Sequence, residues 1–384
     1  MTPADALRHA DRPVSAYVYS RAALRSAAAR VRAALPPGAT LLYAVKANGH
    51  PDVVATLAAA TDGLEVASGG ELALAIAAGA TRIAFGGPAK TDQELHDGVR
   101  AGALIHVESI LELRRLDAIA ARLGLRATAA LRVNRAVAGP DGSHRMTGTP
   151  TPFGIDEAAL DEAFAVPLRA VDLRGFHLHA VSNSLDATAY AAFVAGAITW
   201  SAATAAAHGL DLRYVNVGGG LGVSYTDPST IDLNVLRERL AAVPVPPGVD
   251  LVFEPGRLLA ADAGWYAAEV VDLKRTHGRW FAVLRGGTHH FRLPAAWGYS
   301  HPFTVMPMDG DEVWPWPFDR PSVEGVSVDA VGELCTPRDV LARDVPVSRV
   351  RVGDVLVFAR TGAYGWDISH HDFLRHPHPQ LIVV

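Results

Sequence analysis

Eight short apolar runs, separated mostly by segments of helical composition, constrain the fold of this chain more than any other feature. The runs are residues 41–46, 63–68, 82–87, 104–109, 127–134, 173–180, 214–220 and 251–257. Helical composition marks residues 51–60, 70–78, 92–101, 110–123, 186–208 and 231–242. Continuous apolar runs are typical of parallel strands that are covered on both faces. Eight such strands alternating with helices predict an α/β fold, a (β/α)8 barrel of the TIM type. A doubly wound open sheet is the alternative, but no glycine-rich fingerprint follows the first run.

The character of the chain changes after residue 257, where helical periodicity disappears. Short strand-like runs follow at residues 265–273, 280–284, 322–328, 355–359 and 381–384. A length of 384 residues also suggests two domains rather than one. We therefore predict a barrel over residues 21–258 and an all-β domain, a sandwich or a β-barrel, over residues 259–384. The short strand at 16–20 is expected to join the sheet of this second domain, so that residues 1–20 belong to it.

Composition and charge indicate which kinds of binding partner and which cellular compartment to expect. The net charge is −5 and the pI is about 6.3, which gives no indication of nucleic acid or an anionic membrane as partner. Residues 188–207 carry no charge but are rich in Ala, Thr and Ser, and we interpret them as a barrel helix. Cys335 is the only cysteine, and residues 1–12 lack the apolar core of a signal peptide. These features predict a cytoplasmic protein.

Lys46 is the first candidate for chemistry. The chain has three lysines against 32 arginines, and Lys46 closes the first apolar run. Unlike arginine, lysine loses its proton when desolvated, and its neutral amine then reacts with carbonyl groups. The alternative is a lysine at a strand end whose ammonium group reaches solvent.

Other unusual residues occupy the ends of later runs. His177 and His179 lie on one face of their strand by alternation, Gly218-Gly219-Gly220 end the seventh run, and Glu254-Pro255-Gly256-Arg257 end the eighth. Taken singly, these are compatible with a core histidine, a turn and an ion pair. Barrel active sites gather at the carboxyl ends of strands, and phosphate sites often follow strands seven and eight. A lysine, a phosphate loop and a carboxylate on one rim predict pyridoxal 5'-phosphate as cofactor.

Residues 135–154 interrupt the barrel pattern with a long segment rich in Gly, Pro, Ser and Thr after the fifth run. A barrel places such loops at its active face, so the segment is either a mobile substrate loop or a solvated insertion.

Seven motifs together resemble those of the fold type III pyridoxal-phosphate decarboxylases, the group of ornithine/arginine and diaminopimelate decarboxylases with the alanine racemase-like fold. The motifs are 43–48 (YAVKAN), 65–71 (EVASGGE), 177–182 (HLHAVS), 216–222 (NVGGGLG), 254–257 (EPGR), 332–335 (GELC) with Asp339, and 362–365 (GAYG). They occur in the family's order and spacing, between Tyr17 and Tyr364, so the resemblance covers almost the whole chain.

The resemblance implies four catalytic residues. Lys46 would form the Schiff base with the cofactor, His179 would stack on its ring, Glu254 would pair with the ring nitrogen, and Cys335 would return a proton to the α-carbon. Further cofactor contacts are implied for Ser182, Gly218, Gly219, Gly220, Gly256, Arg257 and Tyr364. In the family this cysteine reaches the cofactor of the other subunit, so the resemblance also implies a homodimer with shared active sites.

Two departures from the family pattern concern the substrate. Family members that act on diamino acids carry an acidic residue after the cysteine, where this chain has Thr336, Pro337 and Arg338. A histidine-rich segment, residues 367–379, replaces the usual Phe-Asn-Gly. Its spacing matches no tetrahedral metal motif, so we predict no metal. This tail resembles the subgroup encoded with siderophore synthetases, which decarboxylates amino acids coupled to citrate. The substrate-binding residues implied are Thr336, Arg338, Asp339, His370, His371 and Arg375; alternatively the tail is surface.

The sequence thus predicts a pyridoxal-phosphate-dependent decarboxylase acting on a small molecule, a citrate-coupled amino acid. A decarboxylase of free diaminopimelate, ornithine or lysine remains an alternative. An amino-acid racemase would need a tyrosine base, whereas Cys335 and Glu254 occupy the relevant motifs. Non-catalytic pyridoxal-phosphate-binding relatives are single barrels without the second domain.

Overall fold

The chain folds into two compact units. The computed structural model describes residues 3–137, 139–308 and 314–384. One unit, here the barrel unit, comprises Arg25–Ser224 and Ser229–Leu259. The other, here the β unit, comprises the chain up to Leu24, Tyr225–Pro228 and Ala260–Val384.

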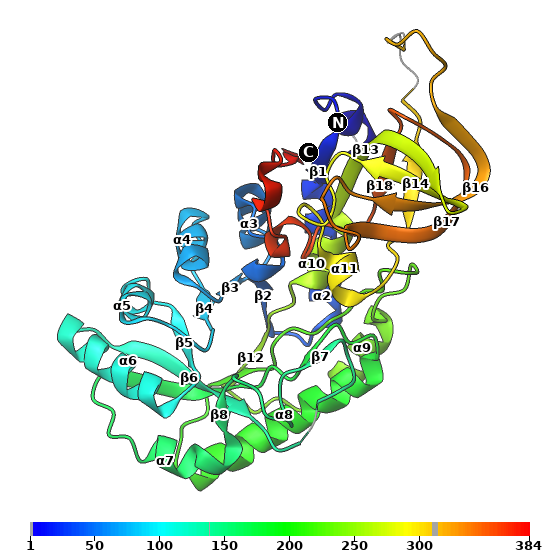
Figure 1. Ribbon diagram of the computed structural model, residues 1–384. Helices are drawn as coiled ribbons and strands as arrows, with labels where there is room; N and C mark the ends of the chain where they lie inside the picture. The colour runs from blue at the N-terminus through cyan, green and yellow to red at the C-terminus, as the bar shows by residue number, and fades with distance from the viewer. Residues whose placement is uncertain (1–2, 138, 309–313) are drawn as a thin grey trace. The chain divides into compact units, whose positions relative to one another are not determined.

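Eight parallel strands form the sheet of the barrel unit, among the residues that the structure describes (Figure 1). They are β2 (Thr40–Ala44), β3 (Gly63–Val66), β4 (Ile83–Phe85), β5 (Leu104–Val107), β6 (Ala127–Asn134), β9 (Val171–His177), β11 (Tyr214–Asn216) and β12 (Asp250–Phe253). Neighbours in the chain pair with one another, and β12 pairs with β2, which closes the sheet. The short β8 (Ile155–Asp156) adds to β6. The predicted (β/α)8 barrel is therefore confirmed.

Helices alternate with these strands, and polar side chains cap their first turns. The helices are α2 (Arg21–Ala34), α3 (Pro51–Ala58), α4 (Gly69–Ala77), α5 (Asp92–Arg100), α6 (Ile110–Leu123), α7 (Leu160–Phe164), α8 (Ala187–Ala207) and α9 (Leu233–Ala241), with 3-10 turns η1 (Val45–Ala47) and η2 (Glu157–Ala159). Ser68, Thr91 and Ser109 each accept a hydrogen bond from the backbone N–H three residues on, which fixes where α4, α5 and α6 begin.

Helix α8 has the length and apolar composition that would suffice to cross a membrane. It contacts α9, β9 and β11 (Figure 1), as expected for a barrel helix.

The barrel interior is filled by side chains from alternate strands. Leu42, Ala84, Ala130 and Tyr214 come from β2, β4, β6 and β11, and Val252 of β12 packs with them. Such layers are the packing expected inside a (β/α)8 barrel. Since the centre is solid, a ligand binds at an end of the barrel.

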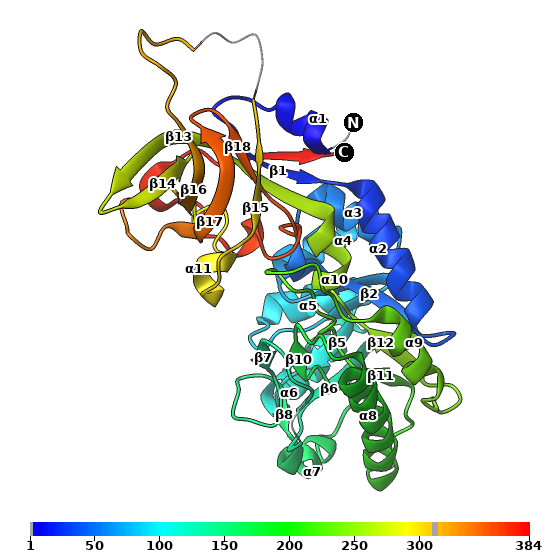
Figure 2. The ribbon, with the colours of Figure 1, turned by 90° about the vertical axis from the view of Figure 1, so that its right-hand side faces the viewer.

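The β unit is built on an eight-stranded mixed sheet (Figure 2). Its strands are β1 (Ser15–Tyr19), β13 (Gly264–Thr276), β14 (Arg279–Leu284), β15 (Phe303–Met306), β16 (Ser322–Val331), β17 (Val340–Arg351), β18 (Val355–Phe358) and β19 (Gln380–Val383). Strand β1 pairs with β13 and β19, so the prediction that residues 16–20 join this sheet is confirmed. The sequence did not indicate β15 and β17.

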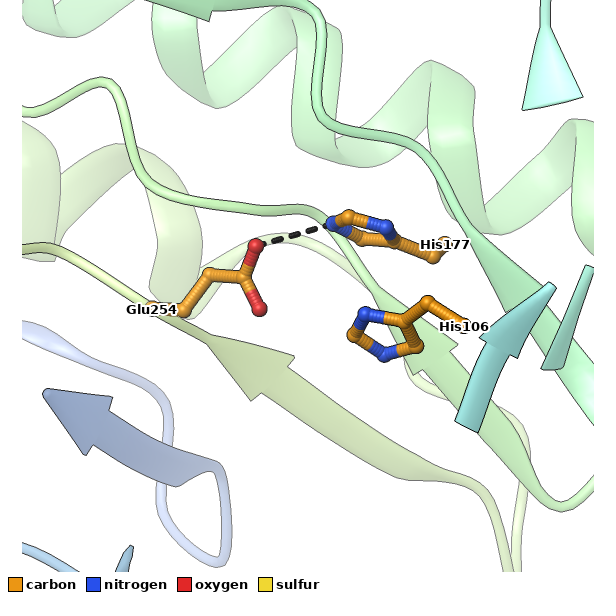
Figure 3. Close-up of side chains that lie close together, drawn as sticks. All are labelled: His106, His177 and Glu254. Carbon is orange, nitrogen blue, oxygen red and sulfur yellow. Dashed lines mark hydrogen bonds and ion pairs between the residues drawn. The ribbon is translucent and has the colours of Figure 1, made fainter. Parts of the chain in front are cut away.

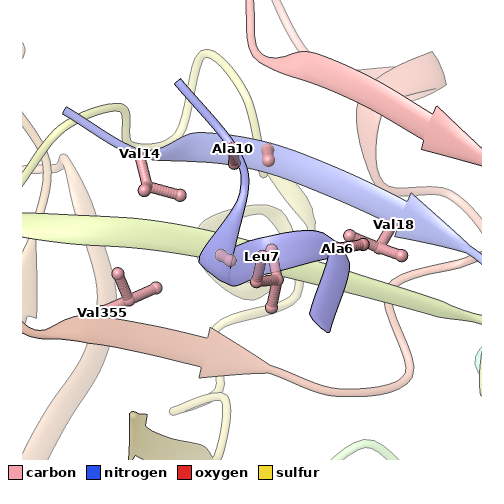
Figure 4. Close-up of a cluster of buried hydrophobic side chains, with 8 residues drawn as sticks. Ala6, Leu7, Ala10, Val14, Val18 and Val355 are labelled. Carbon is pink, nitrogen blue, oxygen red and sulfur yellow. The ribbon is translucent and has the colours of Figure 1, made fainter. Parts of the chain in front are cut away.

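Short helices and an apolar cluster complete the β unit. The helical segments are α1 (Pro3–Arg8), α10 (Arg257–Ala260, across the unit boundary), η3 (Ala261–Ala263), α11 (Leu293–Trp297), η4 (Trp366–Ile368) and η5 (Phe373–Arg375). Leu7 of α1 packs with Val14, Val18 and Val355 (Figure 4). This contact anchors the N-terminal segment to the sheet.

The predicted barrel strands extend too far at their carboxyl ends. The run at 41–46 ends as a strand at Ala44, the run at 173–180 at His177, and the run at 251–257 at Phe253. The residues just after these points are apolar or small but leave the ladder to form turns. Lys46, His179 and Glu254 therefore lie on the connections that follow their strands, not within the strands.

Candidate active site

Lys46 lies in η1, immediately after β2, and its ammonium group faces a buried carboxylate. The Nζ atom of Lys46 is 2.5 Å from Oε2 of Glu65, which β3 contributes beside it. Glu65 is buried, and this desolvation raises the pKa of its carboxyl although Lys46 opposes the effect. The side chain of Lys46 is 40% exposed. The salt bridge to Glu65 thus holds the amine at the mouth of the barrel, where its side chain is partly exposed.

Glu254 follows β12 and is buried among hydrogen-bond donors (Figure 3). His177 Nε2 donates to its Oε1 at 2.9 Å, and Asn216 Nδ2 donates to its Oε2 at 2.8 Å. Burial lowers the pKa of His177 well below its usual value, so the imidazole is a neutral donor. The two donors orient the carboxylate, and its remaining lone pairs can accept a further bond from a ligand N–H.

His106, His177 and Glu254 bring potential metal-ligating atoms within 4.8 Å of one another (Figure 3). The two imidazole rings are stacked, with centroids 4.0 Å apart and planes 20° from parallel. Nitrogen lone pairs lie in the ring plane, so stacked rings do not aim them at a common ion. His106 Nε2 is also 2.9 Å from the hydroxyl of Tyr214. The geometry fits a hydrogen-bonded support for Glu254 better than a metal site.

His179 is held against the glycine-rich loop after β11. The backbone N–H of Gly219 donates to His179 Nδ1 at 3.1 Å, so the proton of the neutral ring is on Nε2. Desolvation lowers the pKa of His179 well below its usual value. Gly218 has a positive φ of 76°, and a Cβ atom there would clash with the His179 ring. Glycine is therefore required at this position for the imidazole to be seated.

Two of the three glycines predicted to bind the phosphate, Gly218 and Gly219, already use their backbone N–H groups within the protein. Gly218 N–H donates to Asn216 Oδ1 at 2.7 Å, and Gly219 N–H is used by His179. Among the described residues, the N–H groups of Gly220 and Gly256 have no acceptor, and they follow the neighbouring strands β11 and β12. A Cβ atom on Gly256 would lie 2.7 Å from that of Ala47. Gly220 and Gly256 are thus better placed as phosphate donors than Gly218 and Gly219.

Two further predicted cofactor residues flank these positions. Ser182 lies in β10 (Val181–Ser182), which pairs with β7 (His144–Arg145) in an antiparallel ladder. The segment 135–154 therefore contacts the strand that bears Ser182, and whether it is mobile stays a hypothesis. Arg257 begins α10 and is buried.

The residues at this end of the barrel therefore fit pyridoxal phosphate. They provide a partly exposed lysine, a fixed buried carboxylate, a half-buried imidazole and two backbone N–H groups that have no acceptor among the described residues. Each corresponds to a different part of that cofactor, namely the aldehyde, the ring nitrogen, the ring face and the phosphate.

The predicted residues of the β unit surround an exposed turn. Cys335 is exposed. The carboxylate of Asp339 is buried and accepts hydrogen bonds from the N–H of Thr288 at 2.6 Å and of Leu334 at 2.8 Å. Burial raises the pKa of Asp339. These two backbone donors let Asp339 fix the turn that carries Cys335, and the direct substrate contact that we predicted for it stays a prediction.

The histidine-rich tail is divided between two environments. Thr336, Arg338 and His370 line one pocket of about 540 Å³. His371 instead stacks on Trp366 at 3.6 Å between ring centroids and is 2.6 Å from its carbonyl oxygen, and Arg375 is an exposed residue of η5. Neither lines that pocket, and their predicted substrate contacts stay predictions. Tyr364 lies before η4 with a positive φ of 55°.

Several residues of the barrel site were assigned no role from the sequence, although Glu65 and Asn216 begin two of the motifs quoted above. Glu65 and His106 sit in the middle of apolar strands, in Gly-Leu-Glu-Val and Leu-Ile-His-Val. An ionisable side chain within a buried run is the signal that could have found both, because burial without a partner is costly. Asn216, which bridges Glu254 and Gly218, has no such signal in the sequence.

Comparisons with known proteins agree with this geometry. The profile of the family described as "Pyridoxal-dependent decarboxylase, pyridoxal binding domain" matches residues 21–261. A protein of Staphylococcus aureus named 2-[(L-alanin-3-ylcarbamoyl)methyl]-2-hydroxybutanedioate decarboxylase is 40% identical, over 98% of this chain and 95% of its own. Diaminopimelate decarboxylase of Aquifex aeolicus is 32% identical, over 96% and 86%. The crystal structure of diaminopimelate decarboxylase from Helicobacter pylori complexed with L-lysine superposes with a TM-score of 0.86 at 24% identity, covering 100% of this chain and 94% of that one.

Proposed function

Because this chain belongs to the pyridoxal-dependent decarboxylase family, we propose that it removes the α-carboxylate of an amino acid whose side chain is coupled to citrate. The family fixes the cofactor, pyridoxal phosphate, and the class of enzyme, a carboxy-lyase. The finer proposal concerns the substrate. It rests on one observation above all: the turn after Cys335 offers Thr336 and Arg338 to the substrate and no carboxylate.

The proposed roles follow from the position of each side chain. Pyridoxal phosphate, when bound, supplies an electron sink for the pair of electrons that CO2 leaves behind. Lys46 would hold the cofactor, and Glu65 keeps the lysine aimed at the barrel mouth. Glu254 would accept a hydrogen bond from the ring nitrogen and so keep that nitrogen protonated. His179 would cover one face of the ring, and Cys335 would deliver a proton to the α-carbon.

The charge of the substrate supports the citrate-coupled class. The name of the Staphylococcus aureus relative describes an alanine unit joined through C3 and an amide to a hydroxy-tricarboxylic skeleton, which is a citrate amide of 2,3-diaminopropionate. A free diamino acid instead needs a carboxylate for its distal ammonium group. Arginine in that place repels such a group and attracts the carboxylates of a citryl group.

A substrate panel tests this proposal. Steady-state evolution of CO2 is measured for the citrate amide of diaminopropionate and the citrate ester of the serine hydroxyl, and for free lysine, ornithine and diaminopimelate. We expect the citrate-coupled substrates to have the higher kcat/KM by at least about tenfold. A higher kcat/KM for a free diamino acid would overturn the proposed substrate, while racemisation without CO2 would overturn the proposed reaction.

We further propose that the protein is cytoplasmic and acts as a homodimer in which Cys335 serves the site of the partner subunit. The exposure of Cys335 on its turn is compatible with delivery to another chain. Hybrid dimers test this arrangement. Inactive Lys46→Ala and weakly active Cys335→Ala subunits, when mixed, should regain activity because one site of each hybrid then has both residues. No recovery after verified subunit exchange would contradict a shared site.

A further inference from the structure

One pocket of the β unit gathers three arginines, of which Arg292 is distant in the sequence from Arg338 and Arg343. It has a volume of about 540 Å³ and is lined by Arg292, Arg338, Arg343, Thr336 and His370, among others. Arg292 precedes α11, Arg338 follows the Cys335 turn, and Arg343 lies on β17. Its volume is in the range of small-molecule sites, about 300–1,000 Å³. Only the β unit contributes to this pocket, which we name the arginine pocket.

Negative charge is scarce around these arginines. No Asp or Glu is among the residues that line the arginine pocket. Within the described residues, the guanidinium groups of Arg292 and Arg338 have no carboxylate partner. Arg343 Nη1 is 3.9 Å from Asp329, but that carboxylate already accepts two hydrogen bonds from Arg279, at 2.6 and 2.9 Å. The lining of the arginine pocket therefore carries a net positive charge, and the buried carboxylate next to it, Asp339, bonds to the backbone of Thr288 and Leu334.

Hydrogen bonds to the backbone hold two of the arginines in place. Ser300 Oγ accepts from the N–H of Arg343 at 2.7 Å and donates to its carbonyl oxygen at 3.2 Å. Ser369 Oγ accepts from the N–H of Arg292 at 3.0 Å and donates to the carbonyl oxygen of Gly365 at 2.7 Å. The C-terminal segment thus positions Arg292 and also supplies His370 to the same wall.

The remaining wall favours a ligand with a carbon skeleton. Leu334, Val340 and Ala342 line the pocket, together with the ring of Phe373. The hydroxyl-bearing residues Thr288, Tyr299, Ser300 and Thr336 line the same pocket. This mixture suits several carboxylates on a short carbon chain, whereas a small inorganic anion would leave the apolar wall uncovered.

We propose that the arginine pocket binds the carboxylates of the citryl group, with Arg292 and Arg343 as specificity-determining residues beside Arg338. The assignment rests on the proposed function and deepens it, since it names the residues that would select the substrate. Leu334 and Thr336 of the pocket wall flank Cys335, which places the carboxylate site next to the proton donor.

Binding of free citrate to the intact holoenzyme tests the pocket without requiring turnover. Calorimetric titration is carried out on the wild type and on Arg292→Gln, Arg338→Gln and Arg343→Gln. Each variant should raise the Kd for citrate at least about tenfold, since each loses a charge-assisted bond. Arg343→Lys should recover part of the affinity. Arg349→Gln is the matched control, because Arg349 lies on the same strand and pairs with Glu324 at 3.4 Å, outside the pocket.

The outcomes are separable from those of the proposed function. Equal citrate affinity in all variants, or none in the wild type, would overturn the pocket assignment. Phosphate binding as tightly as citrate would also overturn it, since a general anion site would remain. The wild type could prefer free lysine as substrate while the three variants bind citrate more weakly than the wild type. That pair of results would overturn the proposed substrate and leave the pocket assignment standing. Urea unfolding midpoints confirm that each variant is folded.

Discussion

The carboxyl end of the barrel and the arginine pocket of the β unit present their charged side chains in opposite ways. At the barrel end, Glu254 is buried and both of its oxygens are hydrogen-bonded. In the arginine pocket, Arg292, Arg338 and Arg343 are exposed, and their side chains are largely unpaired. The first arrangement is preorganised for one cofactor. In the second, the charge of exposed side chains is proposed to select a class of substrate. Cofactor binding is thereby assigned to the barrel unit, and substrate selection to the β unit, which also carries Cys335.

Replacing Lys46 by alanine should have the largest effect, because it removes the covalent link on which the barrel end depends. We expect activity to be abolished and the visible absorbance of covalently bound pyridoxal to be lost. Lys274→Ala is the control, since Lys274 is an exposed lysine of β13. Borohydride trapping of cofactor on the Lys46→Ala protein would refute the assignment.

Glu254→Ala should keep the cofactor but lower kcat by about 10²–10⁴-fold, the range for a lost acid–base group. His177 and Asn216 then lose their common acceptor as well. Absorbance of the bound cofactor separates this result from cofactor loss. Unchanged turnover at saturating substrate would exclude Glu254 from the reaction.

Asp339→Asn should destabilise the β unit by about 1–3 kcal/mol, because an amide group would face one of the backbone donors that the carboxylate satisfies. Urea denaturation measures this loss, and Asp272→Asn on the exposed part of β13 is the control. A stability equal to that of the wild type would show that Asp339 does not fix the Cys335 turn.

His289 should make the β unit sensitive to acid. It is fully buried, neither ring nitrogen has a hydrogen-bond partner among the described residues, and burial lowers its pKa to about 4. The unfolded chain binds a proton below about pH 6.5 while the folded chain does not, so stability is full above that pH and falls as the pH drops towards 4.

His289→Leu should therefore reduce the loss of stability between pH 7 and pH 5 by up to about 2 kcal/mol. The exposed His277 in the same unit gives the control, His277→Asn. Urea unfolding at the two pH values measures the difference. Identical pH slopes in the wild type and the His289 variant would contradict this account.

The sequence indicated the barrel, most strands of the β unit and the main cofactor residues, because each is encoded locally. Lys46 and Glu254 are visible as charges that terminate apolar runs. The support of Glu254 by His177 and Asn216 was not visible, since it depends on two other strands meeting in space. Arg292 and Arg343 were missed for the same reason: nothing in their local sequence distinguishes them from the other arginines, and only the fold brings them to one pocket.

One ratio tests most directly whether cofactor binding belongs to the barrel unit and substrate selection to the β unit. It is kcat/KM for citryl-diaminopropionate divided by kcat/KM for free lysine. It is measured in the wild type, in Glu254→Gln and in Arg343→Gln. We predict that Glu254→Gln lowers kcat/KM for both substrates and leaves their ratio nearly unchanged. Arg343→Gln should lower the ratio at least about tenfold. A ratio that changes equally in the two variants, or only in Glu254→Gln, would contradict the account.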